Sequence, residues 1–448
     1  MRHTPRAWVA RGHAAAGPRA LGLAAVGFVA VGLAAAFFLG AGCAKLDPIR
    51  PESPTTGQAD FSRYVNLGTS VTAGFQSLGW REDFQLLSAP QLLATQAGVG
   101  ASFTQPLLAP PGFPPPMELA SLSPLAFTTA PLPPGPTILV PRDDGYDNLA
   151  IPQLTLNGSF TQKTGGLSDI VLQGQGTAVR QAIAQAPTFL TVELGVNECF
   201  GAVLYANPSF LAPVPVFDAL YTQLMDSLSA GAPAARLALV NLPEVTRLPY
   251  ATAVPIDVTG PFGSGGQTVT VRLKDAGGPL PDDALITLQG APLIPLGYGF
   301  PGAAPPLPDS VVITHAERTA IEAGVAGFNA VIAREAERRG AALVDEHALS
   351  LRLATEGAVV AGVHYTAAYV SGGLFSFDGF HPSTMGSALL ANEMIRAIDG
   401  KFGGRMQPVD LAAVAGTGPA RARPPDLSAF EPALLAAGWR ASVGSYHP

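Results

Sequence analysis

The chain has 448 residues, of which 48% are hydrophobic and 13% are charged, so it can bury the core of one large domain or of two. Four arginines and no acidic residue precede Cys43, which leaves 22 basic against 33 acidic residues from Cys43 onward, a net charge of −11. Neutralising the phosphates of a nucleic acid needs clustered Lys and Arg. No stretch supplies them, so we do not expect nucleic-acid binding.

The N-terminus is typical of an export signal. Arginines precede an apolar run of 23 residues at positions 20–42, which is the order of a signal peptide. Residues 39–42 before Cys43 resemble a bacterial lipobox, in which the Cys is acylated and becomes the new N-terminus, although Leu39 lies four residues before the Cys instead of three. An uncleaved signal anchor or a core helix would also fit this length.

We therefore expect a lipoprotein signal peptide at residues 1–42, lipidation of Cys43 and a solvated, Pro-rich tether at residues 43–60. The body would then be anchored in the cell envelope, facing the periplasm or the cell exterior. Cys199 is the other cysteine, and it is expected to be a small buried hydrophobic residue.

From Phe61 onward, short apolar runs alternate with helical patterns, which predicts a parallel sheet covered by helices. Near-continuous hydrophobicity is typical of strands buried on both faces, and four runs show it: residues 64–68, 189–194, 237–242 and 342–345. A helix is predicted from Thr314 to about Arg339, because Thr314 and Glu317 can form a capping box. A second helix is predicted to start near Ser383.

The first motif that carries chemistry follows the strand at residues 64–68. A strand that ends in Gly-x-Ser lets the chain turn sharply and leaves Ser70 at the carboxyl edge of the sheet, where ligands bind in open α/β folds. Ser70 is thus a candidate nucleophile, or else a helix cap. The motif is not the Gly-x-Ser-x-Gly elbow of α/β-hydrolases, because Thr72 stands in place of the second Gly.

A serine nucleophile needs a base, and the base needs a group that orients it. Asp378 and His381 lie just before a predicted helix, and a tight turn over the two intervening residues can bring the carboxylate to Nδ1 and leave Nε2 free for the serine. His347, two residues after Asp345, is the alternative base. It follows a predicted strand directly, so we expect it to pack or to cap.

Together these segments resemble the sequence blocks of the SGNH (GDSL-like) hydrolases. Residues 68–74 (Gly-Thr-Ser-Val-Thr-Ala-Gly) resemble the first block, residues 194–198 (Leu-Gly-Val-Asn-Glu) the third and residues 378–382 (Asp-Gly-Phe-His-Pro) the fifth. Residues 148–153 and 241–246 resemble the blocks between them. The five segments follow the order of the family.

The resemblance covers residues 61–400, which we predict to be one hydrolase domain. Two stretches would be insertions: a Pro-dense, irregular one at about 107–141 and a β-rich one at about 254–308. Residues 401–448 would be a C-terminal tail. The family implies an α/β fold, a three-layer α/β/α sandwich with a flavodoxin-like parallel sheet and the site on loops at its carboxyl edge.

The resemblance also implies roles for individual residues. Ser70 would attack an ester carbonyl, His381 would act as base and then as acid, and Asp378 would orient it. The oxyanion would be held by the backbone N–H of Ser70, the side-chain amide of Asn197 and a backbone N–H of the second block, at Gln153. No metal or cofactor is required.

Three residues depart from the family pattern. Thr69 stands in place of an Asp that supports the chemistry, Gln153 in place of a Gly that would hold an oxyanion donor, and Glu198 in place of an Asp expected to fix a loop. The leading hypothesis is a serine esterase or lipase-type hydrolase of lipid, acyl or acetylated glycan esters, acting as a monomer and touching the membrane through Cys43. A non-catalytic binding or scaffolding lipoprotein and an acyltransferase remain the alternatives.

Overall fold

The structure is a computed structural model and describes residues 53–122, 125–262 and 267–417. Its centre is a parallel sheet of four strands in the order β1-β6-β7-β14. These are the four predicted strands, with ends that differ from the prediction by two residues or fewer: β1 (Tyr64–Gly68), β6 (Phe189–Glu193), β7 (Arg236–Val240) and β14 (Ala342–Val344).

A fifth segment extends the sheet beyond β1. Asn148 forms a parallel bridge with Asn66, and the Leu149 N–H donates to the Asn66 carbonyl at 2.8 Å. The five segments are numbered here by their order in the chain. Across the sheet they then lie in the order 2-1-3-4-5, which is the flavodoxin-like order. The predicted topology is confirmed.

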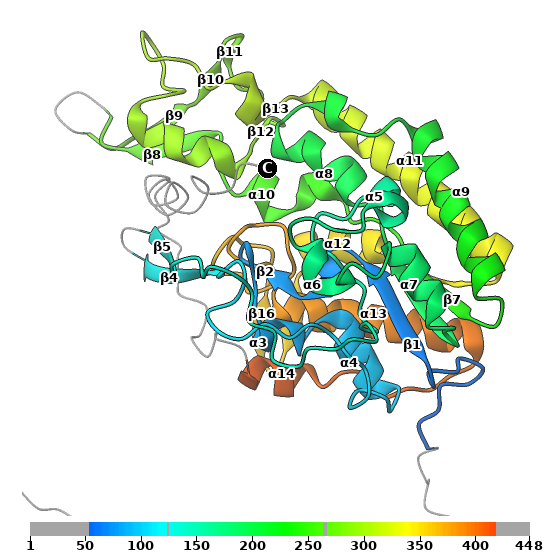
Figure 1. Ribbon diagram of the computed structural model, residues 1–448. Helices are drawn as coiled ribbons and strands as arrows, with labels where there is room; N and C mark the ends of the chain where they lie inside the picture. Colours follow the sequence, from blue (N-terminus) through cyan, green and yellow to red (C-terminus); the bar gives the residue numbers. More distant parts are fainter. Residues whose placement is uncertain (1–52, 123–124, 263–266, 418–448) are drawn as a thin grey trace, which may run out of the picture. The chain divides into compact units, whose positions relative to one another are not determined.

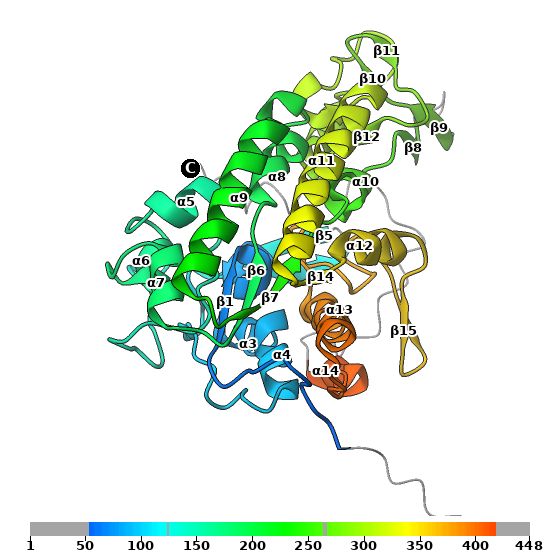
Figure 2. The same cartoon turned by 90° about the vertical axis from the view of Figure 1, so that its right-hand side faces the viewer.

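The strands alternate between two hydrophobic cores, because successive side chains of a strand point to opposite faces. Leu190 and Val192 of β6 belong to one core, with Leu239 of β7, whereas Ala238 and Val240 of β7 belong to the other. Helices cover both faces, so the sheet lies between two helical layers, as Figure 2 shows. The structure thus confirms the three-layer α/β/α sandwich.

On one face lie α7 (Ala178–Ala184), α9 (Val214–Gly231) and α11 (His315–Arg339). The capping box of Thr314 and Glu317 is present at the start of α11. The other face is covered by α4 (Ala89–Gln96) and α13 (Thr384–Phe402), and α14 (Leu411–Thr417) packs on α13. α13 starts next to Ser383, as predicted, and the Ser383 hydroxyl caps it. These helices are seen in Figure 1.

Shorter helices surround the carboxyl edge of the sheet and its connections: α2 (Ser70–Ala73), α3 (Glu82–Gln85), α5 (Leu156–Thr161), α6 (Ser168–Leu172), α8 (Asn197–Leu204), α10 (Pro249–Thr252) and α12 (Glu346–Thr355). Two small hairpins accompany them: β2 (Phe75–Gln76) with β3 (Gly79–Trp80), and β15 (Ala358–Val360) with β16 (Val363–Tyr365).

The Pro-rich stretch was predicted to be irregular, and the structure shows that this prediction is wrong for part of it. It contains an antiparallel hairpin of β4 (Met117–Leu122) and β5 (Leu125–Thr129), held because Met117, Leu125 and Phe127 are buried in the core. The β-rich stretch contains short antiparallel pairs, as expected: β8 (Asp257–Gly260) with β9 (Val269–Arg272), β10 (Lys274–Asp275) with β11 (Gly278–Pro279), and β12 (Leu285–Ile286) with β13 (Val312–Ile313).

The expected signal peptide and Cys43 lie outside the described residues. Within the expected tether, Thr55 forms an antiparallel bridge with Arg405, and the Gln58 N–H donates to the Phe402 carbonyl at 2.8 Å. Among the residues that the structure describes, no helix combines the length and the hydrophobicity needed to cross a membrane.

Candidate active site

Ser70 lies where β1 ends, as the first residue of the single-turn helix α2. Thr69 caps this turn, and Gly74 ends it in the left-handed conformation, with φ +75°. Gly68 is required because a Cβ there would lie 1.9 Å from the Thr72 hydroxyl oxygen. The Ser70 side chain is 8% exposed and lines a cavity, so the sharp turn places its hydroxyl at the carboxyl edge of the sheet.

Asp378 and His381 form the predicted local pair. Their Oδ2 and Nδ1 atoms are 2.9 Å apart, and Asp378 Oδ1 accepts the backbone N–H groups of Phe380 and His381 at 3.0 and 2.9 Å. Burial alone would raise the pKa of Asp378, but the neighbouring His381 and these hydrogen bonds outweigh it and lower the pKa below its usual value. The aspartate is thus held as an anion against the imidazole.

A hairpin that the sequence did not single out supports Asp378. The turn between β2 and β3 places Ser77 and Leu78 at φ +54° and +58°, where side chains are strained. In this conformation the Leu78 N–H donates to Asp378 Oδ2 at 3.0 Å. The Ser77 hydroxyl accepts the Phe377 N–H at 3.1 Å, which ties the hairpin to the Asp378 turn.

The His381 ring lies between two aromatic side chains. Its centroid is 5.2 Å from that of Phe75 and 4.7 Å from that of Phe380. With Nδ1 bound to Asp378, the imidazole lines the same cavity as Ser70. The structure therefore places Ser70 and His381 at one cavity, with the imidazole oriented by its hydrogen bond to Asp378.

The expected oxyanion donors lie at the same cavity. Asn197 begins α8, and its side-chain amide donates one hydrogen to the Leu154 carbonyl at 2.9 Å, which leaves the second amide hydrogen for a ligand. Gln153 has φ +68°, the conformation that favours glycine. Both residues line the cavity with Ser70, so the Gln stands in a backbone position suited to the Gly of the family.

Glu198 fixes the loop that holds these donors. Its Oε1 accepts the Leu156 N–H at 2.6 Å, so the residue next to Asn197 is tied to the loop that carries Gln153. Burial raises the pKa of Glu198 to about 7. Its Oε2 is buried without a hydrogen-bond partner among the described residues.

The alternative base, His347, is placed elsewhere. Asp345 caps α12 by accepting the Ala348 N–H at 3.0 Å, and it also accepts the Asn241 side-chain amide at 2.9 Å. Within the described part of the chain, His347 Nδ1 is buried without a partner. His347 is not among the described residues that line the cavity, so it packs, as expected. Cys199 is fully buried in the core, also as expected.

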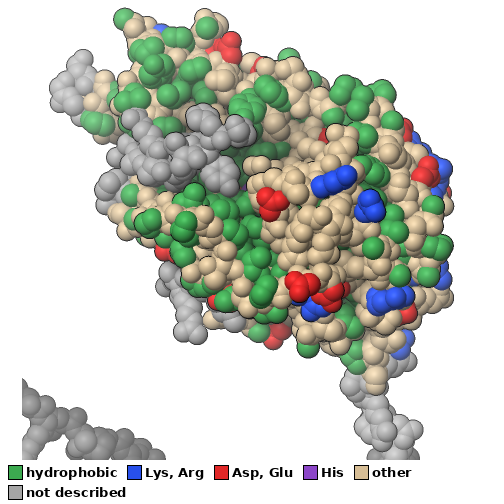
Figure 3. All heavy atoms as spheres, in the orientation of Figure 1, with side chains coloured by type: hydrophobic (Ala, Val, Ile, Leu, Met, Phe, Trp, Pro, Cys, Tyr) green, Lys and Arg blue, Asp and Glu red, His purple; other side chains and the backbone are tan. Residues whose placement is uncertain are grey.

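The cavity has a volume of about 850 Å³ and is largely apolar. Hydrophobic side chains also gather around a hollow on the face shown in Figure 3. Among the described residues of the lining, Glu346 is the acidic one, and sequence reasoning missed it. The apolar lining comes from loops at the sheet edge and from α8, α12 and α13: Val71, Phe75, Leu78, Pro152, Leu167, Val196, Phe200, Leu204, Leu248, Leu349, Leu353, Leu374, Phe375, Phe380 and Leu390.

Solved structures of GDSL-like lipases and esterases match this chain at low identity and low TM-score. A proposed GDSL-like lipase from Parabacteroides merdae matches with 13% identity and a TM-score of 0.36, over 78% of this chain and 100% of that one. The psychrotrophic esterase EstA from Pseudoalteromonas, solved with monoethylphosphonate as inhibitor, has 13% identity and a TM-score of 0.32, over 75% and 96%. An extracellular lipase from Streptomyces rimosus has 12% identity and a TM-score of 0.31, over 72% and 94%.

No family model and no curated protein sequence matches the chain.

Proposed function

We propose that this chain is a serine esterase that hydrolyses carboxylic esters through Ser70, His381 and Asp378. One observation carries the proposal. The Asp378 carboxylate binds Nδ1 of His381 at 2.9 Å, and the imidazole lines the same cavity as Ser70. A serine, a base and a group that orients the base are the parts that nucleophilic acyl transfer needs.

In the proposed reaction, His381 Nε2 takes the proton of Ser70 as its Oγ attacks the ester carbonyl carbon. The tetrahedral oxyanion is held by the Ser70 N–H, the free hydrogen of the Asn197 amide and the Gln153 N–H. The protonated His381 then gives its proton to the departing alcohol. Water attacks the acyl-enzyme with His381 again as base, which releases the acid and regenerates Ser70.

The lining of the cavity supports an ester whose acyl or alkyl group is apolar. Burying such a group beside Ser70 gains free energy from the hydrophobic surface removed from water, at about 0.8 kcal/mol for each buried CH₂. We further propose that the enzyme works in the cell envelope, anchored by acylated Cys43, with esters of lipids or other acyl esters outside the cytoplasm as substrates.

The test is labelling of the full-length protein with a fluorophosphonate, together with hydrolysis of aryl esters. We expect labelling and turnover in the wild type and neither in Ser70→Ala. His381→Ala should be nearly as inactive, and the double variant scarcely worse, because the members of a triad act as a unit. Ser209→Ala, at an exposed serine, and His347→Ala serve as controls that keep full activity. A wild type that is neither labelled nor active would leave a binding or scaffolding protein instead.

A further inference from the structure

Glu193 is a buried carboxylate that the proposed reaction does not use, yet it is bonded to the turn that carries the nucleophile. It is the last residue of β6 and is 2% exposed. Its Oε2 accepts the Thr69 N–H at 2.9 Å, the Thr69 hydroxyl at 2.8 Å and the Thr72 hydroxyl at 3.1 Å. An acidic residue at the end of a mainly apolar strand was the sequence signal that could have revealed it.

These bonds hold the turn on both sides of Ser70. Thr69 precedes the serine and caps α2, and Thr72 closes the same helical turn. The Ser70 hydroxyl and its backbone N–H both project from this turn. The turn also packs closely against Glu193 at Gly68, because an added Cβ there would lie 3.2 Å from Glu193 Oε2.

The geometry points to Glu193 as a positioning residue, whose ionised carboxylate fixes the Thr69–Thr72 turn and so sets the position of the Ser70 nucleophile and its oxyanion N–H. This inference rests on the proposed esterase function. It assigns a role in the reaction to a residue that does not touch the substrate.

Glu193 changes its charge near neutral pH. Burial raises its pKa to about 7 despite the hydrogen bonds from Thr69 and Thr72. Two titratable groups on other elements interact with it: Glu346 of α12, whose own pKa is raised by burial and by Glu193, and Tyr221 of α9, whose raised pKa keeps it neutral. When Glu193 is protonated, it presents a donor where the turn needs an acceptor, and the turn is held less firmly.

Activity should therefore be lost at acid pH for two reasons. His381 must be neutral to accept the serine proton, and Glu193 must be ionised to hold the turn. When two protons each abolish the active form, the acid limb of log kcat/KM against pH has a slope of about two instead of about one.

The experiment measures kcat and KM of the full-length protein on an aryl ester from pH 5 to pH 9. Glu193→Gln keeps the shape but cannot ionise. We expect its acid limb to have a slope of about one, its kcat at pH 8 to fall by about a hundredfold or more, as the slope of two requires, and its KM to stay within about twofold. Glu193→Asp keeps the charge at a shorter reach, so it should lose rate but keep the slope of about two.

Two further variants make the result decisive. Glu335→Gln changes a fully buried glutamate of α11, so it should lower Tm without changing kcat or the slope. Glu346→Gln removes the neighbouring carboxyl, so it should keep the slope and move the acid limb to lower pH. A wild-type slope of one, or a Glu193→Gln variant with wild-type kcat and slope, overturns the inference while leaving the esterase intact. A slope of two that is lost in Glu346→Gln also overturns it, and an inactive wild type overturns both proposals.

Discussion

Asp378 has hydrogen bonds that the local sequence predicts and one that depends on the fold of the whole chain. Three of its hydrogen bonds come from its own turn, from the backbone of Phe380 and from His381. The spacing of Asp378 and His381 predicted this pairing, because a tight turn needs no other part of the chain. The Leu78 N–H, 300 positions away in the sequence, was not predictable, because its position depends on how the β2–β3 hairpin packs.

The proposed oxyanion donors allow a test at the level of single residues. Asn197→Ala removes a side-chain donor, and we expect kcat to fall by about 10²–10³ with a modest change in KM. Gln153→Ala keeps the backbone N–H, so its kcat should change by less than about fivefold. Steady-state kinetics on one aryl ester measures both.

Gln153→Gly is the matched control for that comparison. Because Gln153 has a positive φ, glycine there should stabilise the fold by about 1 kcal/mol and keep the activity. A loss in Gln153→Ala as large as that in Asn197→Ala would show that the Gln153 side chain, instead of its backbone, is the donor.

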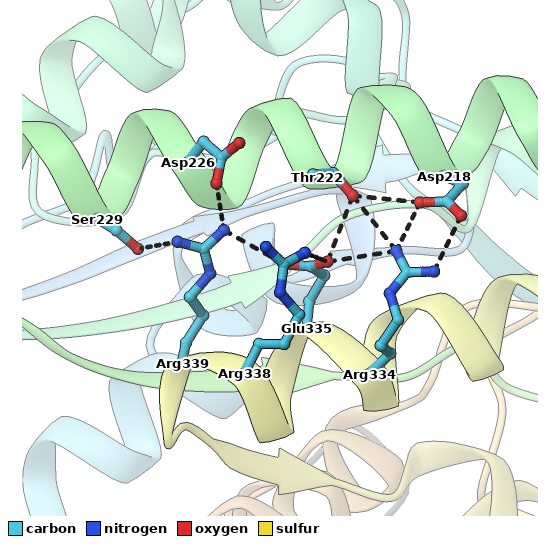
Figure 4. Close-up of polar contacts among 8 residues, drawn as sticks. All are labelled: Asp218, Thr222, Asp226, Ser229, Arg334, Glu335, Arg338 and Arg339. Carbon is cyan, nitrogen blue, oxygen red and sulfur yellow. Dashed lines mark hydrogen bonds and ion pairs between the residues drawn. The ribbon is translucent and has the colours of Figure 1, made fainter.

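Among the elements, α9 and α11 are joined by a network of ion pairs that Figure 4 shows. Glu335 of α11 is fully buried at its centre and pairs with Arg334, Arg338 and Arg339. Arg334 and Arg339 reach across to Asp218 and Asp226 of α9. The network thus fixes how α9 and α11 pack against each other over the sheet.

We expect Glu335→Gln to lower the free energy of unfolding by about 1–3 kcal/mol. Removing one partner of a buried ion pair leaves the other charge uncompensated, but here the arginines are partly exposed and can turn to water, which limits the cost. Denaturant unfolding measures the change. The exposed Glu337→Gln on the same helix should have no effect, and an equal loss there would contradict the role of the network.

The predictability of the elements follows from their burial. The four strands of the sheet were predicted within two residues because both of their faces are buried, which makes them mainly apolar runs. Asn66, Thr191 and Glu193 are buried polar residues inside these strands. The hairpin of β4 and β5 was missed because its strand residues alternate irregularly and its neighbours are prolines, so the burial of Met117, Leu125 and Phe127 could not be read from the pattern.

At the scale of the whole molecule, we expect the chain to be attached to the membrane through Cys43. Cys43→Ser removes the thiol that a lipoprotein acyl group needs, so the variant should no longer be labelled by a radioactive fatty acid or fractionate with membranes. A single acyl chain binds membranes only marginally, and stable anchoring needs several. Cys199→Ser is the control that keeps labelling. Fatty-acid labelling of Cys43→Ser at the wild-type level would contradict the lipoprotein hypothesis.

Buried glutamates should also make the folded protein less stable at pH 8 than at pH 5. Burial raises the pKa of both Glu193 and Glu198 to about 7 from an ordinary value of 4.5. Between these values the folded state holds a proton that the unfolded state has released, so each rise in pH favours unfolding, by up to about 3 kcal/mol for each group above pH 7. The lowered pKa of Asp378 affects the stability only below its ordinary value of 3.8, outside this pH window.

Thermal unfolding between pH 5 and pH 8 should show Tm falling as the pH rises. The fall should be smaller in Glu193→Gln and in Glu198→Gln, whereas the exposed Glu337→Gln should follow the wild type. A Tm that rises from pH 5 to pH 8 in the wild type would show that these carboxyls ionise at no cost in the folded state.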